Sequence, residues 1–499
     1  MSEIRTLSLP KRYEALEREA SQSGYDITAI VHRIDDAASR IETLLRQVNI
    51  GGLGRFELFL GRSGSGKTTF FKTLTKFFTG TTVNTIPHDI SLRDVKSYIE
   101  QRTSELGDRQ VWVMYERDNQ SMTKEEAFEF LEDLRVLFRQ DNGKIVICWP
   151  LTHEPTAKLL SDTAWNVGRD SLVDIGTKGI YTFNGPSKAD YKNIADLTTR
   201  TITGDGLEAF GISDADLSII ISESETISEF FSRTELKASE IAGHYRDLLK
   251  EKPVPSVWIL VSGDDSKDLN LTVASLTQGT QKSIDIDRVV KFLDDPKLDA
   301  AYLKEWKKRR SKVAFLLRLF DVRLFELPPN VALACIRAFG DAETRKPLKL
   351  QSVSARSAIE TISRSALFRA LAKEEYGANA YLRATDDETK HEYIRIQASA
   401  KSGDKKLNKA LAEGVQKYLE SKSLPATVTA EKQNNDDNLK PDIKIIQADG
   451  KIICLEPTWR STGSEIPNEI PEKQNTLTVG HIQKYLLEKM LSYVNEYDF

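Results

Sequence analysis

The stretch GRSGSGKTT, residues 61–69, constrains the fold of this chain more than any other feature. It satisfies the pattern GxxxxGK[ST] and lies between an apolar run, FELFL, and a helix-forming run, KTTFFKTLTKFF. Glycines here let backbone N–H groups turn inward around phosphates, while the lysine reaches the terminal phosphates and a threonine hydroxyl ligates Mg²⁺. The stretch therefore predicts a strand, a phosphate-binding loop and a helix that hold ATP and Mg²⁺. The expected binding residues are Gly61, Ser63, Gly64, Ser65, Gly66, Lys67, Thr68 and Thr69.

Apolar and amphipathic segments alternate after this loop. Runs typical of strands (TVNTI, QVWVMYE, KIVICWPL and GIYTF) are separated by runs typical of helices (SLRDVKSYIEQRTSEL, TKEEAFEFLEDLRVLFRQ and EPTAKLLSDTAW). Alternating strands and helices form parallel sheets with right-handed crossovers. The expected fold class is therefore α/β, with a parallel-sheet domain over residues 50–190 that follows an N-terminal helical segment, residues 1–49.

Residues 50–190 resemble a P-loop NTPase of the AAA type. In that family a second motif has four apolar residues followed by Asp-Glu, where the Asp holds the Mg²⁺ shell and the Glu polarises the attacking water. Here VWVM is followed by Tyr115 and Glu116. The resemblance implies that Glu116 is catalytic, and two outcomes stay open: it supports slow hydrolysis, or the site binds ATP and switches conformation without efficient turnover. Asp118 is a possible substitute acid, and Thr152 matches the polar sensor position.

The same resemblance implies a homo-oligomer, because AAA-type modules often complete their site with an arginine from a neighbouring subunit. Arg169 and Arg200 come late in the module, and the sequence does not choose between them. Beyond the module, residues 191–399 are rich in helical patterns and poor in strand patterns. They predict a mostly helical lid and middle domain.

The stretch KPDIKIIQADGKIICLEPTWR predicts a hairpin with a defined register. If ADG is a three-residue loop, Gln447 pairs with Lys451, and counting back places Asp442 opposite Glu456. Two carboxylates that face each other on one sheet face form a Mg²⁺ or Mn²⁺ site, or else repel each other at a cost.

Residues 400–499 resemble the PD-(D/E)xK nucleases, so we expect a small α/β domain similar to restriction endonucleases. Asp442 and Glu456 match the motif as catalytic metal ligands, and Glu413 sits where the family's preceding helix supplies a further acid. The departure is Thr458 in the lysine position. The resemblance implies that Lys484 on the trailing helix, beside Gln483, or Arg460 takes over the lysine's role; otherwise the domain only binds.

The amino-acid composition limits the kinds of partner that we expect for this chain. Charged residues make up 29% of the chain and the formal net charge is −4, so contact with a polyanion such as DNA requires a local patch. The three cysteines lie among apolar neighbours, which is typical of core residues in a reducing compartment. No signal-like N-terminus or run of 18 apolar residues occurs, so we expect a cytoplasmic protein with no membrane contact.

These observations lead to two main hypotheses. The first is an ATP-binding, ATP-hydrolysing protein that controls a metal-dependent DNA phosphodiesterase; by analogy such a combination suggests bacterial anti-phage defence. The second is an ATP-switched oligomeric scaffold that recruits a separate effector protein and carries an inactive nuclease-like domain. Tyr115 and Thr458 favour the second, because each replaces a chemically active residue of its family. A signalling ATPase without a nucleic-acid role is a third alternative.

Overall fold

The computed structural model describes residues 6–27, 30–103, 110–117, 121–140, 144–248, 254–279, 281–295, 301–375, 385–399, 404–431, 441–461 and 476–496. These residues form two compact units, each with its own sheet. The first unit comprises Leu7–Leu207 and Ser213–Ser239; the second comprises Glu208–Ile212 and the chain from Glu240 onward.

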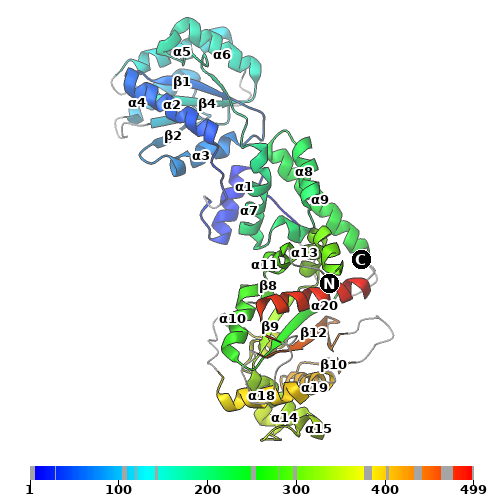
Figure 1. Ribbon diagram of the computed structural model, residues 1–499. Helices are drawn as coiled ribbons and strands as arrows, with labels where there is room; N and C mark the ends of the chain where they lie inside the picture. Colours follow the sequence, from blue (N-terminus) through cyan, green and yellow to red (C-terminus); the bar gives the residue numbers. More distant parts are fainter. Residues whose placement is uncertain are drawn as a thin grey trace. The chain divides into compact units, whose positions relative to one another are not determined.

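The first unit is built on a five-stranded parallel sheet in the order β2-β3-β4-β1-β5 (Figure 1). Its strands are β1 Arg55–Leu60, β2 Thr82–Ile86, β3 Gln110–Met114, β4 Ile145–Leu151 and β5 Ile180–Thr182. The central strands β1, β3 and β4 are buried, because their mostly apolar sequences pack against helices on both faces of the sheet. This confirms the expected parallel sheet and the α/β class.

Helices cover both faces of this sheet. One face packs against α4 Val95–Thr103, α5 Lys124–Phe138 and α6 Glu154–Val167, and the other against α2 Asp35–Gly51 and α3 Lys67–Phe77. The unit also contains α1 Tyr13–Ser23, α7 Tyr191–Thr203, α8 Asp214–Glu223 and the first part of α9 Ile227–Leu248. Residues 1–49 are therefore not a separate segment: α2 buries Ile41, Leu44 and Val48 against the sheet.

The second unit contains a seven-stranded mixed sheet in the order β10-β11-β12-β6-β9-β8-β7. Its strands are β6 Ser256–Ser262, β7 Thr277–Gln278, β8 Ser283–Ile284, β9 Arg323–Leu327, β10 Ala426–Ala430, β11 Ile443–Gln447 and β12 Ile452–Trp459. β12, β6 and β9 run parallel, and β10, β11 and β12 form an antiparallel meander. The hairpin of β11 and β12 therefore extends a sheet whose centre comes from residues far upstream.

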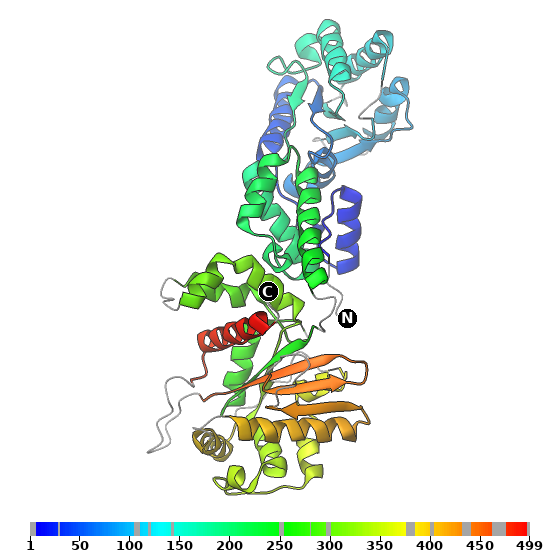
Figure 2. The same cartoon turned by 90° about the vertical axis from the view of Figure 1, so that its right-hand side faces the viewer.

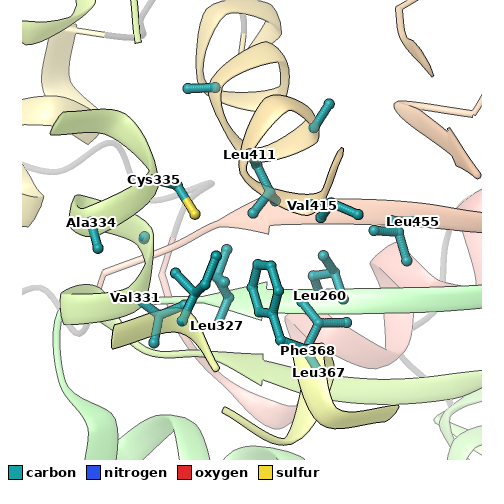
Figure 3. Close-up of a cluster of buried hydrophobic side chains, with 14 of the residues drawn as sticks. Leu260, Leu327, Val331, Ala334, Cys335, Leu367, Phe368, Leu411, Val415 and Leu455 are labelled. Atoms are coloured by element: carbon teal, nitrogen blue, oxygen red, sulfur yellow. The ribbon is translucent and has the colours of Figure 1, made fainter. Parts of the chain in front are cut away.

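Two helical layers enclose this second sheet. One contains α14 Pro329–Phe339, α16 Ala355–Ile362, α17 Ala366–Leu371, α18 Asp387–Ser399 and α19 Lys405–Ser421, whose apolar side chains pack on Leu260, Leu327 and Leu455 (Figure 3). The terminal helix α20 Val479–Glu496 lies across the opposite face (Figures 1 and 2). The remaining helices are α10 Ser266–Leu276, α11 Ile286–Val290, α12 Ala301–Lys308, α13 Arg310–Leu319 and α15 Ala342–Arg345.

The predicted boundaries at 191 and 400 differ from this division. Residues 191–399 do not form a middle domain of their own, because β6 and β9 are central strands of the second sheet. Both strands are short, and periodicity alone does not distinguish such a short segment from a buried piece of helix.

No described helix is long and apolar enough to cross a membrane.

Candidate functional site

The glycine loop connects the end of β1 to the start of α3. β1 ends at Leu60 and α3 begins at Lys67, so the intervening residues lie at the carboxyl edge of a central parallel strand. Gly64 and Gly66 have φ values of +81° and +97°, which side chains rarely allow. The sequence between strand and helix therefore forms the turn that the pattern predicts, at a helix N-terminus suited to anions.

Lys67 folds back over this loop. Its side chain is buried, and its Nζ lies 2.6 Å from the Gly61 carbonyl oxygen and 3.0 Å from that of Arg62. Nζ also donates to Thr152 Oγ1 at 3.2 Å, from the residue that follows β4. The ammonium is therefore fixed at the loop, and the residue at the predicted sensor position touches it.

A cavity of about 420 Å³ opens beside the loop, within the first unit. Loop residues form part of its wall, and the rest comes from the N-terminal segment and from α7 and α9. Ser65 Oγ is buried and has no hydrogen-bond partner among the described residues, and Thr68 is exposed at the first turn of α3. These donors fit a phosphate group with its Mg²⁺: Lys67 and the loop N–H groups would bind phosphate, and Thr68 would ligate the ion.

Two supports of the loop were not predicted from the sequence. Gly185, at φ +77°, packs so closely on the loop that a Cβ there would lie closer than 3.0 Å to the Ser65 carbonyl oxygen. The backbone N–H of Ser228 donates to the Gly64 carbonyl oxygen at 3.2 Å. Gly185 lies in the sequence NGP, which signals a turn but not its contact with the loop.

The two polar residues of the predicted second motif, Tyr115 and Glu116, have different surroundings. The Tyr115 side chain is buried against the core, and burial raises the pKa of its phenol well above the ordinary value. It is therefore a packing residue, not a substitute metal ligand. Glu116, at φ +58°, is exposed, and its Oε2 lies 3.2 Å from His88 Nδ1. Arg117 donates to the carbonyl oxygens of Pro87 and Ile90, which fixes the turn that carries His88.

The other candidate residues of the first unit are Arg200, Arg169 and Asp118. Arg200 is paired with Asp196 one helical turn earlier, at 2.7 Å, and Arg169 lies in a short turn after α6. Asp118 lies outside the described residues.

In the second unit the hairpin has the predicted register. Ile443 pairs with Leu455, and the Gln447 N–H donates to the Lys451 carbonyl oxygen at 2.9 Å. Continuing the ladder by one residue places Asp442 opposite Glu456. The two acids therefore face each other, as the three-residue loop implies.

Lys489 of α20 lies between these acids. Its Nζ is 3.1 Å from Asp442 Oδ2 and 2.5 Å from Glu456 Oε2, and Glu456 is almost fully buried, at 1% exposure. Burial raises the pKa of Glu456, although the nearby Lys489 ammonium acts in the opposite direction. Burial also lowers the pKa of Lys489, but Glu456 and the other acidic groups nearby outweigh this effect and raise the lysine pKa overall. The Lys489 ammonium lies between the two acids and offsets the repulsion expected of two facing carboxylates.

Two further groups modify the charge of this cluster. Burial and the neighbouring Asp442 raise the pKa of Asp404 to about 6, while Arg460 opposes the shift. Arg460 Nε donates to Thr458 Oγ1 at 2.6 Å, so the threonine at the position where the nuclease resemblance predicts a lysine orients an arginine.

Two predicted residues lie elsewhere. Glu413 is exposed on α19, 4.0 Å from Lys417, because the buried stripe of that helix turns it outward. Lys484 is exposed on α20 and pairs with Glu488 at 3.8 Å. Lys489, five residues later, projects from a different side of the helix, and it is the lysine that reaches the acids. The sequence gives the spacing of α20 but not which face of the helix meets β12.

The donor set of this cluster fits a two-carboxylate cation site. Mg²⁺ is commonly bound through one or two carboxylates together with waters and substrate phosphates. Asp442 and Glu456 supply such a pair, provided that the Lys489 ammonium withdraws from one of them. Among the described residues no group of three or more His, Cys, Asp and Glu side chains forms a metal cage.

We found no match to this chain among protein-family models or among curated proteins.

Proposed function

We propose that the first unit binds a nucleoside triphosphate, with ATP as the expected ligand, at the loop of residues 61–69. The observation that carries this proposal is the position of Lys67: a buried lysine held by loop carbonyls, beside a cavity, at the start of a helix. Glu116 is the acid that would polarise water for hydrolysis, because the other residue of the second motif, Tyr115, is buried in the core.

Replacing Lys67 with alanine is expected to weaken ATP binding on the order of 100-fold, since a charge-assisted contact contributes ~3 kcal/mol. Titration calorimetry with ATP·Mg²⁺ measures this. Lys76→Ala is the matched control, because Lys76 lies on the same helix but pairs with Asp26 at 3.8 Å, and neither residue lines the cavity. Equal affinities of Lys67→Ala and wild type would contradict the proposed site. Glu116→Gln is expected to retain ATP binding and lose phosphate release.

We propose a second activity, metal-dependent cleavage of a phosphodiester, for the second unit. The observation that favours it is the meeting of Asp442, Glu456 and Lys489 at one point of the sheet. A bound Mg²⁺ or Mn²⁺ would supply Lewis-acid charge and lower the pKa of a water. Asp442 and Glu456 would hold the ion, and Lys489 would place positive charge near a phosphate oxygen. DNA is the expected substrate, under control of the nucleotide site.

A cleavage assay distinguishes this activity from the scaffold alternative. In this assay the protein is incubated with plasmid DNA and Mg²⁺ or Mn²⁺, with and without ATP. The proposal is supported if the wild type cuts the plasmid and Glu456→Gln cuts it at least ~100-fold more slowly, because the carboxamide of glutamine lacks the carboxylate charge. Lys451→Gln, on the same hairpin but at its exposed turn, serves as control. ATP-dependent assembly without cutting, lost in Lys67→Ala, supports an oligomer that recruits an effector protein.

A further inference from the structure

A buried hydrogen bond links the last turns of α20 to the acid on β12. The Tyr493 hydroxyl donates to Glu456 Oε1 at 2.5 Å. Both side chains are almost inaccessible to water, Tyr493 at 3% and Glu456 at 1% exposure. A hydrogen bond from a phenol to a carboxylate is charge-assisted, and its strength increases where water is excluded.

This bond gives the two oxygens of Glu456 different partners. Oε1 accepts from Tyr493, while Oε2 faces the Lys489 ammonium at 2.5 Å. The terminal torsion of a glutamate is otherwise broad and nearly two-fold, so the carboxylate could turn without such a constraint. With Tyr493 in place, Oε2 is the oxygen directed toward the side that Lys489 shares with Asp442.

The same helix supports this arrangement at three successive positions. Tyr485, Lys489 and Tyr493 are four residues apart and therefore project from one face of α20. The Tyr485 hydroxyl donates to the Pro457 carbonyl oxygen at 3.1 Å, next to Glu456 in β12. The helix thus fixes the strand backbone and both oxygens of the acid.

We infer that Tyr493 is a positioning residue of the cation site, holding Glu456 so that Oε2 faces Asp442 and the ion. The inference rests on the second activity proposed above. Tyr493 acts through Glu456 and needs no contact with the substrate. Groups that orient a metal ligand in this way typically contribute 10- to 100-fold to metal affinity. Loss of the hydroxyl should therefore weaken cation binding while the acid itself remains.

Binding of Mn²⁺ to the full chain, followed by the electron paramagnetic resonance signal of the free ion, tests this role. Tyr493→Phe is expected to bind Mn²⁺ about tenfold more weakly than the wild type. Tyr418→Phe is the matched control: its hydroxyl is also buried in the second unit, but it has no hydrogen-bond partner among the described residues. Tyr418→Phe should bind Mn²⁺ as the wild type does.

The possible outcomes separate this inference from the activity on which it rests. Equal Mn²⁺ affinity in Tyr493→Phe and the wild type overturns the positioning role and leaves the cation site intact. A wild type that binds no Mn²⁺ overturns both. If Tyr493→Phe fails to fold, Tyr493→Leu, which also removes the hydroxyl and adds no other donor, decides the question. Weakened Mn²⁺ binding in a folded Tyr493→Leu variant, with Tyr418→Phe unchanged, supports the role, and unchanged binding overturns it.

Discussion

Lys489→Met should destabilise the second unit by about 3 kcal/mol, because removing one partner of a buried ion pair leaves an uncompensated charge. In this protein the removed ammonium pairs with two carboxylates at once, and Glu456 has almost no access to water. Methionine fills a similar volume, so the loss reflects charge more than packing. Urea denaturation measures the free energy of unfolding, and hydrogen exchange of β12 peptides assigns the change to this unit.

Lys484→Met is the control on the same helix. Lys484 is exposed and pairs with Glu488 at 3.8 Å, so its loss should change stability by less than about 0.5 kcal/mol. Adding Glu456→Gln to Lys489→Met should recover part of the stability, because one of the two unpaired charges is then gone. A Lys489→Met variant as stable as Lys484→Met would contradict the ion cluster as described.

Gly185→Ala should disrupt the proposed nucleotide site although residue 185 is outside the loop. The added Cβ would lie closer than 3.0 Å to the Ser65 carbonyl oxygen, so the loop must move to accept it. Because phosphate recognition depends on the direction of several backbone N–H groups, we expect ATP affinity to fall on the order of 10- to 100-fold. Fluorescent-nucleotide titration measures the affinity.

Gly80→Ala is the control that distinguishes the effect of this close contact from the effect of backbone strain. Gly80 has φ +73°, close to the +77° of Gly185, but an added Cβ there meets nothing within 4 Å. Both variants carry the left-handed backbone cost of about 1–2 kcal/mol in unfolding free energy. Only Gly185→Ala should lose nucleotide affinity, and equal affinities in the two variants would show that Gly185 does not support the loop.

The two sites were predictable to different degrees. In the first unit the loop is contiguous in sequence, so glycine conformation and the adjoining helix determine the position of Lys67 locally. In the second unit the pairing of Asp442 with Glu456 was predictable because a short turn sets the register of the hairpin. The sequence analysis named Lys484 and Arg460, whereas Lys489 is the lysine that contacts the acids, because helical spacing alone does not say which face of α20 packs on the sheet.

The glycine loop between β1 and α3, the parallel sheet around it and the facing acids of the hairpin could be predicted from the amino-acid sequence. Each of these depends on residues close together in the chain, where turn geometry and side-chain periodicity act directly. Long-range packing, in contrast, brings β6 and β9 into the second sheet, places Gly185 against the loop, and brings Lys489 and Tyr493 to the acids. Lys489 is 47 residues from Asp442, and Tyr493 is 37 from Glu456. Such contacts arise from how helices pack on a sheet, and packing depends on the shape and burial of whole surfaces rather than on local pattern.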